Sequence, residues 1–136
     1  MKVLVATDGS EPSIKAVQRA LELAEQGAEV TIMSVAYFAG DQFDATFYDI
    51  QEKLEKDARA ALNQAKAMFD AKNIHAETVL ELGLVPANNI IRRATEGKFD
   101  RVIMGSTGKS GLTLALIGST ASKVVTNAPC EVTIVR

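Results

Sequence analysis

A glycine-rich segment of the sequence, residues 105–120, contains the residue types that suit phosphate binding. Its small and polar residues gather in two clusters, Gly105-Ser106-Thr107-Gly108-Lys109 and Gly118-Ser119-Thr120. Because glycine has no side chain and tolerates positive φ angles, its backbone can approach an anion closely and direct successive N–H groups at it. The segment therefore indicates a place where the phosphates of a nucleotide could bind.

The second cluster also marks the start of a helix, which we expect to run from Ser119 to Thr126. The first N–H groups of a helix have no partner within it, and its amino end carries a partial positive charge, so both favour an anion. Lys109 and Lys123 could add positive charge. An alternative stays open at this point, in which the segment is an ordinary loop and Ser119 only caps the helix.

Two common phosphate-binding motifs do not fit this sequence. Gly108-Lys109-Ser110 resembles the end of a P-loop, but Ile103 stands where that motif needs its first glycine. The turn Thr7-Asp8-Gly9-Ser10 lacks the G-x-G-x-x-G fingerprint of dinucleotide-binding proteins. A nucleotide site in this chain must therefore be of another kind.

The elements that position these residues follow from alternating apolar runs and helical periods. The apolar runs predict strands at residues 3–6, 30–35, 75–82, 101–104 and 131–136, with helices between them; the longest helix would turn Ile50, Leu54, Ala61, Leu62, Ala65 and Phe69 inward. This alternation predicts one α/β domain over residues 1–136, a doubly wound parallel sheet with helices on both faces. Such sheets bind ligands at the carboxyl ends of their strands. The turn at residues 7–10 and the glycine-rich segment both follow such an end.

Composition narrows the function classes. A net charge of -2 and a pI near 5.4 argue against a nucleic-acid-binding surface. One cysteine and one histidine exclude an intrachain disulfide and a Cys/His zinc cluster. The apolar runs fall short of the ~20 residues that span a bilayer, and the first residues do not resemble a signal peptide. We therefore expect a cytoplasmic protein that does not insert into membranes.

His75 and Cys130 are the remaining candidates for chemistry. Both would lie at the amino edge of the sheet, opposite the expected ligand site. We expect His75 to be a surface or packing residue and Cys130 a small buried apolar residue. This leaves Asp8 as the one candidate general base near a bound phosphate, where a metal ion would occupy it.

The spacing of the glycines resembles a more specific pattern. Gly105, two residues, Gly108, nine residues and then Gly118-Ser119 is similar to the ATP-binding signature of the universal stress protein family. The resemblance covers the whole chain, including Gly83 with Pro86 and the closing Ala128-Pro129-Cys130-Glu131-Val132. It implies a five-stranded sheet in the order 3-2-1-4-5, in which Asp8 and Gly105 face one crevice.

The resemblance also implies roles for individual residues. Gly105, Gly108, Gly118, Ser119 and Thr120 would hold the ribose and phosphates, Asp8 would hold Mg²⁺, and Ala6, Thr7 and Val35 would line the adenine pocket, with Met104, Thr107 and Lys109 completing the site. Two alternatives stay open: Asp8 could be a turn-forming aspartate, and Val35 could be plain core. Residues 112–117 are nearly all apolar where relatives often carry a basic residue, so we expect a lower phosphate affinity.

The expected function is that of an ATP-binding stress-response or regulatory protein, in which nucleotide occupancy sets conformation or the choice of an unidentified protein partner. The alternatives are a slow ATPase or phosphotransferase, and an interaction module that works without nucleotide. We also expect a homodimer through the last strand, because residues 132–135 have high β-propensity and no charge, and this strand would be an edge of the sheet.

Overall fold

The computed structural model describes residues 1–38, 45–108 and 117–136. Strands and helices alternate along these ranges: β1 (Lys2–Ala6), α1 (Glu11–Glu25), β2 (Glu29–Tyr37), α2 (Ala45–Asp70), β3 (Glu77–Gly83), α3 (Pro86–Glu96), β4 (Arg101–Gly105), α4 (Ser119–Asn127) and β5 (Glu131–Val135). Within the described ranges, no helix combines the length and the apolar composition needed to cross a bilayer.

The strands form one parallel sheet in the order β3-β2-β1-β4-β5, which confirms the predicted fold. β1 lies at its centre, where Val3 is paired with Val30 of β2 on one side and with Arg101 of β4 on the other. The direction of winding reverses between β1 and β4. A reversal of this kind leaves a crevice at the carboxyl ends of the two strands.

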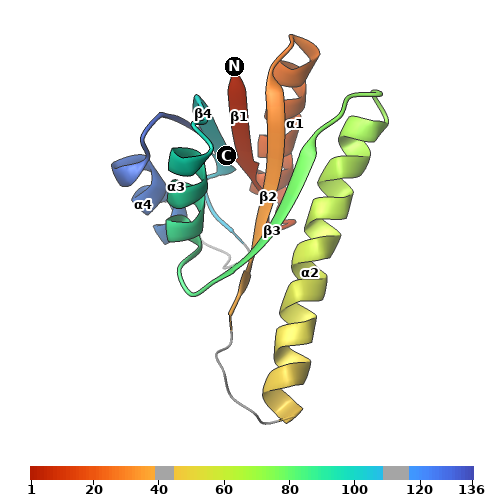
Figure 1. Cartoon of the computed structure of the whole chain (residues 1–136), viewed down its shortest axis with the longest axis vertical. Coiled ribbons are helices and arrows are strands. Elements are labelled where there is room, and N and C mark those ends of the chain that lie inside the picture. The colour runs from red at the N-terminus through yellow and green to blue at the C-terminus, as the bar shows by residue number, and fades with distance from the viewer. Residues whose placement is uncertain (39–44, 109–116) are drawn as a thin grey trace.

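Helices cover both faces of the sheet, as Figure 1 shows, with α1 and α2 on one face and α3 and α4 on the other. Each face of the sheet has its own apolar core, and alternate residues of β1 contribute to the two cores. Val3 and Val5 pack beneath α1 and α2, whereas Leu4 packs against α3 and α4, and all three are fully buried. Burial of each such side chain contributes roughly 1.5–3 kcal/mol, so β1 is a rigid base for the turn that follows it.

Two strand bounds differ from the prediction by two residues each, and one residue of the longest helix differs in its exposure. β2 continues to Tyr37, and β3 begins at Glu77, not at His75, because its ladder with β2 starts at the pair Thr31 and Glu77. Ile50 was expected to face the core but is 45% exposed. α2 has 26 residues, about 39 Å of helix, and its first turns extend past the end of the sheet (Figure 1).

Candidate functional site

A cavity of about 480 Å³ lies at the carboxyl ends of β1, β2 and β4. Every predicted site residue that the structure describes lines it: Ala6, Thr7, Asp8, Val35, Met104, Gly105, Thr107, Gly108, Gly118, Ser119 and Thr120. Lys109 lies outside the described residues. Lys123 is an exposed residue of α4 and is not part of the lining. Two turns that are about a hundred residues apart in the sequence therefore meet around one cavity.

The turn after β1 is held by its own side chains. The Ser10 N–H donates a hydrogen bond of 2.9 Å to Oδ1 of Asp8, and the Gly9 N–H donates one of 3.2 Å to Oγ1 of Thr7. The Ser13 hydroxyl lies 2.9 Å from that of Thr7 and donates to the Ser10 carbonyl. Asp8 thus has the turn-forming contact that the sequence left open, and this contact fixes one of its two carboxylate oxygens.

The second carboxylate oxygen of Asp8 faces the turn after β4. A Cβ atom added at Gly108 would lie 2.7 Å from Oδ2 of Asp8, so a side chain at this position would push the carboxylate away. The absence of a side chain at Gly108 therefore allows the two turns to approach each other. The carboxylate stands between them, at the border of the cavity.

Gly105 has a reason to be glycine that differs from the predicted one. A Cβ atom there would lie 2.8 Å from the backbone of Pro12 and Ser13 in α1. Any side chain would therefore force the end of β4 away from the start of α1. Gly105 also lines the cavity, so its lack of a side chain serves the packing of β4 against α1 at the border of the site.

Ser106 connects two parts of the glycine-rich segment, residues 105–108 and 118–120, to the last strand, β5. Its N–H donates to the carbonyl of Val135 in β5 at 2.8 Å, and its own carbonyl accepts the Gly118 N–H at 2.7 Å. The Gly118 N–H is therefore engaged within the protein, and the donors expected to reach a ligand are those of the first residues of α4. Ser106 lines the same cavity and is fully buried, and its hydroxyl has no hydrogen-bond partner in the described part of the chain.

Further walls of the cavity were not predicted. α2 contributes Leu54, Asp57 and Ala58, and α3 contributes Pro86 and Ile90. Their apolar periodicity indicated burial against the sheet. It gave no sign that these two helices, on opposite faces, reach far enough along the strands to border a site at their carboxyl ends.

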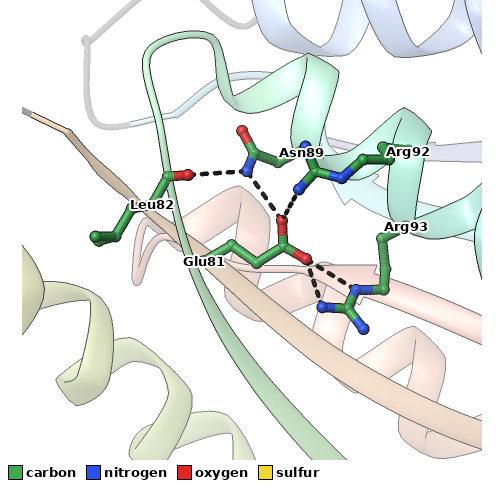
Figure 2. A network of polar contacts seen from close by, with 5 residues as sticks. All are labelled: Glu81, Leu82, Asn89, Arg92 and Arg93. Carbon is green, nitrogen blue, oxygen red and sulfur yellow. Dashed lines mark hydrogen bonds and ion pairs between the residues drawn. The ribbon is translucent and has the colours of Figure 1, made fainter.

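A group of four polar side chains connects α3 to β3, and we call it the α3 clamp: Glu81, Asn89, Arg92 and Arg93 (Figure 2). Oε1 of Glu81 accepts hydrogen bonds from Asn89 at 2.9 Å and Arg92 at 2.5 Å. Oε2 accepts two from Arg93, at 2.8 and 2.6 Å. The Asn89 amide also donates to the carbonyl of Leu82 at 3.1 Å.

The clamp carboxylate is stabilised in its charged form. The Glu81 side chain is only 10% exposed, and this burial raises its pKa. The hydrogen bonds from Asn89 and Arg93, together with the charges of both arginines, outweigh that effect, so the pKa of Glu81 lies below its ordinary value. The carboxylate therefore stays ionised and keeps its partners at neutral pH.

His75 and Cys130 lie at the amino edge of the sheet, as predicted. His75 contacts Glu77 at 3.1 Å and is largely exposed. Cys130 is only partly buried, because it sits in the turn before β5 and not within the strand. Burial and the negative charges of Asp100 and Glu131 raise the pKa of its thiol, which disfavours the nucleophilic thiolate.

We expect neither His75→Ala nor Cys130→Ser to change nucleotide affinity, because both residues lie at the opposite end of the strands from the cavity. Calorimetric titration of each purified variant with ATP, beside the unaltered protein, checks this. A large loss of affinity in either variant would mean that the ligand binds at the amino edge.

Comparisons with known proteins agree with this architecture. The profile of the universal stress protein family matches residues 1–136. A universal stress protein of Methanocaldococcus jannaschii is 35% identical over 139 residues, covering 99% of this chain and 81% of that protein. Among solved structures, universal stress protein UspA from Lactobacillus plantarum has a TM-score of 0.88 at 24% identity, covering 100% of this chain and 97% of that one. A universal stress protein in complex with cAMP has a TM-score of 0.76 at 27% identity, with coverages of 100% and 97%. This chain belongs to the universal stress protein family.

Proposed function

We propose that this chain binds ATP, with Mg²⁺, in the cavity at the carboxyl ends of β1, β2 and β4. The observation that carries the proposal is the composition of the cavity lining. Its β2 side is mainly apolar, with Met33, Val35 and Ala36 beside Ser34 and Tyr37, and its β4 side holds the glycine-rich turn and the start of α4. An apolar side suits a base, and glycine turns at a helix start suit phosphates.

Three further observations support a nucleotide as the ligand. The cavity volume of about 480 Å³ falls within the range of roughly 300–1,000 Å³ usual for small-molecule sites. The buried hydroxyl of Ser106 is a donor for which the described residues offer no acceptor, and a phosphate oxygen would supply one. A solved relative, at 27% identity, is in complex with cAMP.

The proposed metal site fits the donors that the cavity offers. Mg²⁺ is usually held by one or two carboxylates together with substrate phosphates and water. Asp8 supplies a carboxylate directly beside the Gly108 turn, so it would hold the ion jointly with the phosphates. The described residues contain no group of three His, Cys, Asp or Glu side chains that could hold a metal without the nucleotide.

The nucleotide content of the protein tests the proposal directly. Protein purified without added nucleotide is denatured, and released small molecules are identified by mass spectrometry; protein stripped of nucleotide is then titrated with ATP. We expect released adenine nucleotide, or saturable binding of one ATP per chain. Neither release nor binding would contradict the proposal and favour a nucleotide-independent interaction module.

We further propose that nucleotide occupancy, not turnover, is the property that serves regulation. The carboxylate beside the glycine turns, Asp8, already accepts the Ser10 N–H and is the proposed metal ligand, so it is poorly placed to activate water. Ser106 connects the turn after β4 and the start of α4 to β5 through its hydrogen bonds with Gly118 and Val135. A bound nucleotide could therefore affect β5, an edge strand of the sheet. ATP hydrolysis measured against a blank without protein should stay slow, and rapid turnover would instead identify an enzyme.

The edge strand β5 is the proposed dimer interface. Among the described strands only β4 pairs with it, so its outer row of backbone groups faces away from the sheet. The side chains from Val132 to Val135 are partly exposed and uncharged. Antiparallel pairing with β5 of a second copy would satisfy the outer row and close a two-fold dimer.

We expect light scattering on a sizing column to give twice the chain mass at micromolar concentration. Amide hydrogen exchange should show, in addition, that peptides containing residues 131–135 become more protected as the protein concentration rises. Peptides from β3, the other edge strand, serve as the internal control. A monomer would contradict the proposal, and concentration-dependent protection confined to another element would move the interface there.

A further inference from the structure

The α3 wall of the cavity consists of Pro86 and Ile90, which lie in the first two turns of α3. Asn89, next to Ile90, does not line the cavity and belongs to the α3 clamp. Figure 2 shows its amide directed at Glu81 and at the carbonyl of Leu82 near the end of β3. The same turn of α3 therefore carries Ile90, which lines the cavity, and Asn89, which connects the helix to β3.

Asn89 leaves little room for α3 to move relative to β3. Asn89 is 4% exposed, and a Cβ atom added at Gly83 would lie 2.0 Å from its Oδ1 atom, so the amide sits directly against the backbone of β3. Arg92 and Arg93 lie one turn further along α3 and bind separate oxygens of the same carboxylate. A buried carboxylate without these donors would be strongly unfavourable, so β3 and α3 are held in one relative position.

We propose that Glu81 and Asn89 are positioning residues of the nucleotide site, which set the distance of Pro86 and Ile90 from the ligand through the α3 clamp. The inference rests on the proposed function and names a specific part of the ligand. Neither Glu81 nor Asn89 lines the cavity. The wall that they position is apolar and has nothing to offer a phosphate, so it contacts the base or sugar.

This assignment divides the site into two parts that can be tested separately. Loosening the α3 wall should weaken the binding of ligands that contain the nucleoside. It should leave the turn after β4 and the start of α4, which are proposed to hold the phosphates, intact. A variant that is partly unfolded would instead bind every ligand more weakly. Adenosine and inorganic tripolyphosphate are the two halves of ATP, and their inhibition constants against a labelled ATP report on the two parts.

The test uses Glu81→Gln, which neutralises the clamp carboxylate, and Asn89→Ala, which keeps the ion pairs and serves if the first variant folds poorly. Asp70→Asn is the matched control, because it removes an exposed ion pair with Lys66 at the end of α2 remote from the cavity. Circular dichroism and thermal melting establish that each variant is folded at the temperature of the titration.

We expect ATP and adenosine to bind roughly tenfold more weakly to either clamp variant, with tripolyphosphate unchanged and the control unaffected. An unchanged ATP affinity in folded clamp variants would overturn the inference, as would an equal loss for tripolyphosphate. Failure of the unaltered chain to bind ATP would overturn the proposed function and this inference together. That result is distinguishable from the two above, in which the unaltered chain binds ATP.

Discussion

Replacement of Gly118 with valine is expected to lower ATP affinity at least about 100-fold, equivalent to about 2.7 kcal/mol, without unfolding the protein. Gly118 is buried, lines the cavity and precedes Ser119 at the start of α4. Its φ of -66° and ψ of 164° are accessible to valine, so the backbone can keep its course and its hydrogen bond to Ser106. The branched side chain would stand where the phosphates approach the helix start.

Calorimetry on the folded variant measures this loss. Ser122→Val is the matched control, because it places the same side chain one turn further along α4, at an exposed position outside the cavity lining. The control should bind ATP normally. Unchanged affinity in Gly118→Val would remove the start of α4 from the site.

Asp8→Asn should have the second largest effect, and only in the presence of Mg²⁺. Asparagine keeps an oxygen that can accept the Ser10 N–H, so the turn after β1 is preserved. It loses the negative charge that a hard cation prefers. We expect affinity for Mg-ATP to fall roughly tenfold, while affinity for ATP in the presence of a chelator stays the same or rises, since a negative charge near the phosphates has been removed.

Parallel titrations with Mg²⁺ and with EDTA separate the two roles of Asp8. Ser13→Ala is the comparison variant, because it breaks the hydroxyl contacts of the same turn without touching the carboxylate. Equal losses with and without Mg²⁺ in Asp8→Asn would mean that Asp8 only shapes the turn.

Local patterns in the sequence were sufficient for the strands and for the glycine-rich part of the cavity lining, whereas Ala6, Val35 and Met104 came from the family resemblance. Apolar runs such as Val3-Leu4-Val5 identify strands buried on both faces, and the glycine spacing identified a segment that does border the cavity. These predictions succeeded because each depends on neighbouring residues. The strand order came from the family resemblance, since periodicity alone does not order parallel strands.

The features that were missed depend on residues far apart in the sequence or on helix length. Gly105 is required by Pro12 and Ser13 of α1, which no local pattern around residue 105 reveals. Asn89 looks like a surface residue of a helix, and its burial is explained only once Glu81 and Gly83 are seen beside it. Ile50 matches the apolar period of α2 but is largely exposed, so the period alone predicted its burial wrongly.

The buried carboxylate of Glu81 has a consequence for how many copies can join. A parallel sheet has two edges, here β3 and β5, and a chain that offered both could add copies without end and grow into a fibre. Charged side chains that point inward from an edge strand are one of the devices that discourage such growth. Glu81 is such a residue on β3, held by two arginines, whereas β5 has no charge from Val132 to Val135. Association through β5 alone would therefore stop at two chains.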